Sequence, residues 1–139
     1  MQLTTICLSL IVVASTKNVE DIIKQSEEDW DAIFMSYKKQ CIEESGVDEN
    51  DVLEPFEKVM FPDKRNFKCY IKCQYALLNY MDVEGNFNLE KMVNTITALS
   101  PEVAKNCIDR ASTDVNLCDK AYSFVICAVP KVLTNLHEE

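Results

Sequence analysis

The stretch Lys68-Cys69-Tyr70-Ile71-Lys72-Cys73 decides the fold, because it places two cysteines four residues apart in a segment with helical patterning. At that spacing both sulfurs leave one face of a helix. They cannot bond to each other across a single turn without bending the backbone, so the spacing favours bonds to two different neighbouring helices. The cysteines available as partners lie upstream and downstream, at Cys41, Cys107, Cys118 and Cys127. The sequence therefore predicts a central helix tied covalently to two others, with the pairing left open.

The chain begins with an uncharged segment, residues 1–15, that contains the apolar run Ile6-Cys7-Leu8-Ser9-Leu10-Ile11-Val12-Val13-Ala14. This run is short for a membrane span and has the character of a secretory signal peptide, cleaved after Ala14 or one residue later. We predict a signal peptide over residues 1–15 and one domain over residues 16–139, with an uncleaved anchor as the alternative. Cleavage removes Cys7, and the six cysteines that remain predict a disulfide framework in a secreted protein.

Charge and composition exclude several classes of partner and fold. The chain has 23 acidic and 14 basic residues, for a formal net charge of −9. A field of this sign repels nucleic acid and anionic membranes, so we expect neither as a partner and no membrane insertion after signal cleavage. With only two glycines and four prolines, all-β architectures and long linkers are disfavoured.

Apolar residues recur at helical spacing along most of the remaining chain, which predicts an all-α fold of about six helices. Asn88 and Ser100 are expected to cap helices, and Pro101 suits a first helical position. Gly46 is a stop signal, and Pro130 is expected to end or kink the last helix. The predicted helices are Val19–Cys41, a short one between Asp48 and Met60, Phe67–Met81, Leu89–Leu99, one opened by Ser100 that carries Val103 to Ala111, and Leu117–Val129.

The cysteine spacing resembles that of the six-cysteine insect odorant-binding protein family, which includes the pheromone-binding proteins. Three residues separate Cys69 from Cys73, and eight separate Cys118 from Cys127. Neighbouring residues agree with the family at Gly46-Val47, Phe61-Pro62, Glu84-Gly85-Asn86 and Cys118-Asp119-Lys120-Ala121-Tyr122. The resemblance implies helices around an apolar cavity and three interlocked disulfides, which join Cys41 to Cys73, Cys69 to Cys118, and Cys107 to Cys127.

The resemblance also implies a function. We expect an extracellular carrier that binds small hydrophobic ligands, odorants or pheromones, non-covalently and transports them through aqueous fluid such as sensillar lymph. No cofactor is expected; an olfactory receptor is a candidate partner, and weak homodimerisation is left open. The alternatives are a carrier of a non-olfactory, lipid-like ligand such as a hormone or fatty acid, and a secreted helical interaction protein without a ligand cavity.

A carrier of this kind needs concave apolar walls with few polar groups. Each candidate wall residue can equally belong to an ordinary core. A position on the apolar face of a helix does not show whether the side chain faces a cavity or a neighbouring helix. Tyr122 is the best candidate for a hydrogen bond to a ligand, with a bond to the backbone as the alternative. The predicted ligand-binding residues are Phe34, Phe56, Met60, Leu77, Leu89, Met92, Ile96, Val103, Ile108, Tyr122, Val125 and Ala128, closed by Val132 and Leu133.

Catalysis and metal binding find little support in the sequence. The single histidine, His137, lies three residues from the end, where a nucleophile and base are hard to assemble. The cysteine spacings do not suit zinc, and an EF-hand centred on Gly85 would begin at Tyr80 and end at Lys91. The short segment after Cys127 resembles family members whose tail covers the pocket, so acid-driven ligand release is not expected.

Overall fold

The computed structural model describes the body of the chain, and within it the fold is all-α, as predicted. The predicted signal peptide lies outside the described residues, which are residues 36–53 and 61–138 (the last four by backbone alone) with Glu20, Asp21, Lys24, Glu28, Ala32 and Ile33. No strand occurs in this part, where an isolated antiparallel bridge joins Met81 to Phe87. The helices with assigned bounds are α2 (Lys38–Ser45), α3 (Glu49–Leu53), α4 (Arg65–Leu77), α5 (Leu89–Thr95), α6 (Pro101–Ala111) and α7 (Leu117–Glu138).

Three disulfides link four of these helices in series. Cys41 of α2 is bonded to Cys73 of α4, and Cys69 of α4 is bonded to Cys118 at the start of α7. The third bond joins Cys107 of α6 to Cys127 of α7. These are the pairs that the family resemblance implies, and the two cysteines of α4 do reach different helices.

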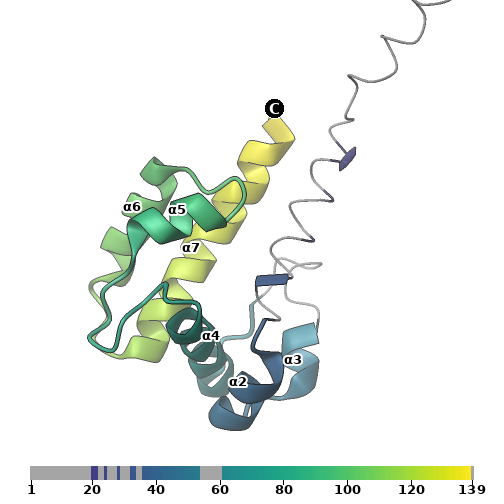
Figure 1. The fold of residues 1–139 in the computed structure, drawn as a ribbon, viewed down its shortest axis with the longest axis vertical. Helices are drawn as coiled ribbons and strands as arrows, with labels where there is room; N and C mark the ends of the chain where they lie inside the picture. Colours follow the sequence, from purple (N-terminus) through teal and green to yellow (C-terminus); the bar gives the residue numbers. More distant parts are fainter. Residues whose placement is uncertain are drawn as a thin grey trace, which may run out of the picture.

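The helices pack so that α7 runs beside both α4 and α6, while α5 lies against α6 and α2 against α4 (Figure 1). One apolar cluster fills the space between them. Its largest fully buried side chains on α4 and α7 are Phe67, Tyr70, Ile71, Phe124, Val125, Val129 and Val132. Burial of apolar side chains at these inward positions stabilises the helix pairs, which short helices need in order to persist.

The central helix α4 ends at Leu77 and not at Met81, where the sequence pattern placed its end. Asn79 adopts the left-handed conformation with φ 59°, which asparagine tolerates better than most residues. The N–H groups of Tyr80 and Met81 then both return to the carbonyl of Tyr75, at 2.8 and 3.3 Å. Because of this turn Met81 lies outside the helix, where it forms the isolated bridge with Phe87.

Loop 82–86 is held by its own acidic residue. The Asp82 carboxylate accepts hydrogen bonds from the N–H groups of Glu84 and Asn86, both at 2.9 Å, and from the Asn86 amide at 3.2 Å. These bonds, with those from Asn86 foremost, lower the pKa of Asp82. Gly85 turns the loop at φ 87°, where a Cβ atom would lie 2.6 Å from the Leu117 side chain. The Asp82 carboxylate is thus engaged by the backbone and side chain of its own loop.

Two helix starts follow the predicted capping. The Asn88 side chain accepts from the Lys91 N–H at 3.1 Å, and the Ser100 hydroxyl accepts from the Val103 N–H at 3.1 Å. Helix α5 ends at Thr95, earlier than the predicted Leu99. Beyond it Ile96 is extended and Ala98 has φ 64°, a left-handed conformation that cannot continue a helix.

Most of the predicted helix Val19–Cys41 lies outside the described residues, and its described positions from Glu20 to Ile33 are helical, but a turn separates them from α2. Ser36 and Tyr37 form a turn before it, and the Ser36 hydroxyl donates to the Ala32 carbonyl at 2.7 Å. Serine side chains that bind the preceding turn in this way favour helix ends over helix interiors. The helix continues past Cys41 and ends at Gly46, whose φ of 69° confirms the predicted stop.

Helix α7 passes through Pro130 and continues to Glu138, beyond the predicted end at Val129. Proline lacks the N–H that would bond to the carbonyl of Ile126. Because Pro130 and Ile126 are both exposed, water can satisfy that carbonyl. The last turns of α7 extend past α5 and α6 and do not fold back as a separate tail (Figure 1). Val132, two residues beyond Pro130, is nevertheless buried.

The disulfides should differ in their contribution to stability. The bond from Cys69 to Cys118 spans 49 residues and the bond from Cys107 to Cys127 spans 20. Loop entropy in the unfolded chain then predicts that replacing the first pair by alanine lowers the free energy of unfolding by about 4 kcal/mol, and the second pair by about 3 kcal/mol. Denaturant unfolding followed by circular dichroism measures both, and the reverse order would contradict a mainly entropic origin.

Candidate ligand-binding site

The predicted wall residues that the structure describes converge on one apolar cluster. Phe34, Phe56 and Met60 lie outside the described residues. Fully buried members of the predicted set are Met92, Ile96, Val125, Ala128 and Val132. Partly buried members that pack against this cluster are Leu77, Leu89, Val103, Ile108, Tyr122 and Leu133. Their role as ligand contacts stays a prediction, because burial in one cluster is common to a pocket wall and a filled core.

A surface hollow beside the start of α4 is lined mainly by charged and polar residues, unlike the apolar cluster. It is lined by Gly46, Asp48, Asp51, Lys64, Arg65 and Asn66. Lys64 and Asp51 form an ion pair there, with 3.0 Å between Nζ and Oδ2. Charged walls of this kind do not suit an apolar molecule, so the apolar cluster remains the better candidate site.

The sequence patterns did not single out Gln74, a polar residue that is buried on the apolar face of α4. It is 1% exposed and is the sole buried polar side chain among the residues the structure describes. The signal was available, because Gln74 follows Ile71 by three residues and precedes Leu77 by three, which places it on the apolar face of α4. Its amide Nε2 donates to the Tyr70 hydroxyl at 3.0 Å. Its Oε1 atom has no hydrogen-bond partner.

Tyr122, the predicted polar contact, takes part in a different interaction. Its hydroxyl donates to the carbonyl of Phe61 at 3.1 Å, and the Nζ atom of Lys68 lies 4.9 Å from the centre of its ring. Partial burial, more than the nearby Asp63 carboxylate, raises the pKa of the Tyr122 hydroxyl. The structure therefore has the backbone bond that the sequence left as the alternative, and the hydroxyl proton is engaged.

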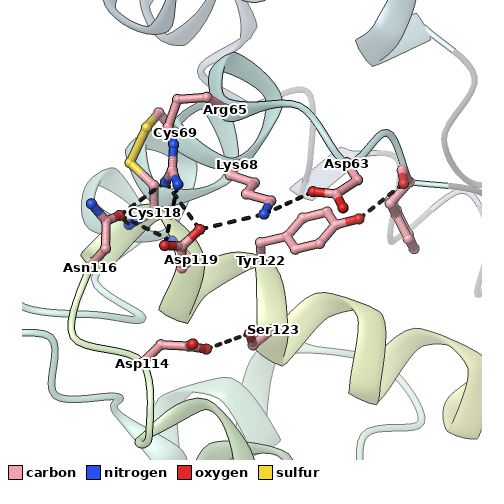
Figure 2. A network of polar contacts seen from close by, with 11 residues as sticks. Asp63, Arg65, Lys68, Cys69, Asp114, Asn116, Cys118, Asp119, Tyr122 and Ser123 are labelled. Carbon is pink, nitrogen blue, oxygen red and sulfur yellow. Dashed lines mark hydrogen bonds and ion pairs between the residues drawn. A yellow bond between two sulfur atoms is a disulfide. The ribbon is translucent and has the colours of Figure 1, made fainter.

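Figure 2 shows the polar network to which Tyr122 belongs, between the start of α4 and the start of α7. Arg65 Nη1 lies 3.0 Å from Asp119 Oδ1, and Lys68 Nζ lies 3.5 Å from the same oxygen. Lys68 Nζ also lies 2.9 Å from Asp63 Oδ1. The hydrogen bond from Arg65, followed by the contributions of Lys68, holds the pKa of Asp119 below its usual range. The Asp63 hydrogen bond raises the pKa of Lys68, and the Asp119 contacts add to it.

This network lies beside the disulfide between Cys69 and Cys118 (Figure 2). The Asn116 side chain accepts from the N–H groups of Cys118 and Asp119, at 2.9 and 3.3 Å, and so caps α7. Arg65 also donates to the Asn116 side chain at 3.2 Å. The interactions hold the two helix starts together and so position the apolar faces of α4 and α7, but they do not form a reactive centre.

Two searches of the described residues bear on other kinds of site. In residues 36–53, 61–134 and the described positions before them, no three His, Cys, Asp or Glu side chains are placed to hold a metal ion. No described helix is long and apolar enough to cross a membrane.

Comparison with protein families decides how this arrangement is classified. The model of the PBP/GOBP family matches residues 23–131, a range that includes all six cysteines of the framework. The chain belongs to the PBP/GOBP family. The resemblance inferred from the cysteine spacing is thereby confirmed.

Individual relatives of this PBP/GOBP protein are odorant-binding proteins of flies and mosquitoes. General odorant-binding protein 99a of Drosophila melanogaster is 25% identical over 113 residues, which cover 76% of this chain and 78% of the relative. General odorant-binding protein 99b of Drosophila melanogaster is 22% identical over 129 residues, covering 86% and 83%. Odorant-binding protein 10 of Aedes aegypti is 30% identical over 98 residues, covering 66% and 67%. No solved structure matches the chain significantly.

The network at Asp119 should make stability depend on acid. Because its pKa is lowered in the folded protein, Asp119 stabilises the fold above about pH 4 and loses this effect as pH falls through the folded pKa. We expect Asp119→Asn to be less stable than the wild type at pH 7.4 and pH 5, by the same amount, and the difference to shrink as pH falls below about 4. Urea unfolding at each pH measures this difference.

The matched control is Asp109→Asn, which removes an exposed carboxylate from α6. Its stability should follow that of the wild type across the same range. If the gap between Asp119→Asn and the wild type already closed between pH 7.4 and pH 5, the assignment of a lowered pKa to Asp119 would be wrong.

Proposed function

We propose that the mature chain is an extracellular carrier that binds small hydrophobic molecules non-covalently and transports them through aqueous fluid. The observation that carries the proposal is membership of the PBP/GOBP family, together with the similarity to fly proteins that are named general odorant-binding proteins. Odorants or pheromones in sensillar lymph are the proposed ligands and setting. An olfactory receptor is a proposed partner, and the chain is not proposed to be an enzyme.

Three features of the chain support this role. The apolar cluster gathers eleven of the predicted wall residues from α4, α5, α6, α7 and the segment after α5. Disulfides persist in an oxidising compartment, which agrees with the proposed signal peptide over residues 1–15 and the domain over residues 16–139. The net charge of −9 favours solubility at the high concentration that a carrier needs.

Two other functions remain as alternatives. A carrier of a hormone or fatty acid outside olfaction would use the same apolar cluster, and the tissue of expression separates it from an odorant carrier. A secreted interaction protein with a filled interior would also bury Met92, Val125 and Ala128, as the structure does. Ligand uptake distinguishes that function from either carrier.

The direct test is a titration of the oxidised mature chain with an apolar naphthylamine probe, whose fluorescence rises in apolar surroundings. We expect saturable uptake at micromolar concentration, with displacement by medium-chain alcohols, aldehydes and small aromatic compounds. A protein with three disulfides and full helicity that takes up no probe would have a filled core. That result would overturn the carrier function.

One substitution tests whether the predicted wall faces the ligand. Val103, partly buried on α6, is replaced by tryptophan, and the control is Val115→Trp, at a side chain that is 95% exposed. Extra volume in a close-packed site costs about 1 to 3 kcal/mol, so Val103→Trp should weaken probe binding about tenfold or more. The control should bind like the wild type. Equal affinities for all three proteins would remove Val103 from the site.

A further inference from the structure

We propose that Gln74 is the hydrogen-bonding anchor of the ligand site and that its Oε1 atom selects ligands carrying a hydroxyl group. The inference rests on the proposed carrier function and names a class of ligand for it. It begins with the position of the residue. Gln74 is 1% exposed, on the α4 face that also carries Tyr70, Ile71 and Leu77.

The side-chain amide of Gln74 has a hydrogen-bond partner for its donor group but none for its acceptor. The amide offers two donor hydrogens on Nε2 and two acceptor positions on Oε1. Nε2 donates to the Tyr70 hydroxyl at 3.0 Å, which fixes the plane of the amide. Oε1 is buried and has no partner. A buried acceptor without a partner destabilises the folded protein, and such groups are few in native structures.

The described residues provide no hydrogen-bond donor for Gln74 Oε1. Burying a polar atom without a hydrogen bond costs free energy, so a partner supplied from outside the chain would stabilise Oε1. A buried water molecule is stable where two to four polar groups surround it. The neighbours of Gln74 on its helix face are Ile71, Leu77 and the ring of Tyr70, which make a poor water site.

A ligand hydroxyl meets both requirements of this position. Its O–H donates to Gln74 Oε1, and the carbon chain attached to it packs against the surrounding apolar side chains. Aldehydes, ketones, esters and hydrocarbons have no donor to offer. A fatty acid would bring a buried carboxylate close to a carbonyl oxygen, which electrostatics opposes. Among ligands of equal chain length, the site should therefore prefer the alcohol.

Tyr70 acts as a positioning residue in this arrangement. Its hydroxyl accepts the Gln74 N–H and so turns Oε1 away from itself. Burial raises the pKa of Tyr70, so the hydroxyl keeps its proton throughout the physiological range. Removing this hydroxyl leaves the amide free to rotate and present either end to a ligand, which should weaken the preference for alcohols without abolishing binding.

The test measures competition against the apolar probe by decanol, decanal and decane, using the oxidised mature chain. We expect the wild type to bind decanol about three- to tenfold more tightly than decanal or decane, the effect of one net hydrogen bond. In Gln74→Met, which keeps length and flexibility, the three affinities should become equal while decane binding stays at the wild-type value. In Tyr70→Phe the preference for decanol should fall to an intermediate value.

The matched control is Gln40→Met, which makes the same replacement at an exposed position on α2 and should keep the wild-type preference. Wild-type protein that binds the probe but does not prefer decanol would overturn the assignment of Gln74, as would a preference for decanal or a preference that survives Gln74→Met. If that variant does not fold, an unchanged preference in Tyr70→Phe overturns it equally. Failure of the wild type to take up any probe would instead overturn the carrier function.

Discussion

The structure depends most on the junction between α4 and α7. A disulfide from Cys69 to Cys118 joins the two helices at their starts, and the ion pairs of Arg65 and Lys68 with Asp119 lie next to it. The bond limits how far these helices can separate, while the charged side chains restrict how they rotate about it. With the starts held in this way, the apolar faces that carry Phe67 and Phe124 must meet along the helices.

The other elements take their places from this pair. Helix α2 is bonded to α4 through Cys73, and α6 is bonded to α7 through Cys127. An aromatic contact attaches the segment that follows α4, because the rings of Phe87 and Phe124 lie 5.3 Å apart, and Tyr75 of α4 lies 6.0 Å from the same ring of Phe124. Two covalent links and one aromatic cluster thus extend the junction to most of the described body.

Sequence patterns predicted the parts of this fold that depend on local chemistry. The caps at Asn88 and Ser100 and the stop at Gly46 involve neighbouring residues only, so they are readable from the chain. The early end of α4 and the passage of α7 through Pro130 depend on the hydrogen bonds of single backbone groups with a turn or with water. The spacing of apolar residues carries no information about these bonds. Gln74 was missed because apolar periodicity counts the residues that fit a stripe and passes over the one that does not.

Helix α5 contains no cysteine, so no disulfide ties it to the other helices. Helices α2, α4, α6 and α7 are tied into one covalent unit, whereas α5 is held by its packing on α6 and by a hydrogen bond between the hydroxyls of Tyr80 and Thr95 at 2.8 Å. Segments held by few contacts open at lower free energy than the global unfolding of a protein. Met92 and Ile96, buried on this segment, can therefore be uncovered while every disulfide remains intact. An opening on the α5 side would therefore reach the interior without breaking a covalent bond.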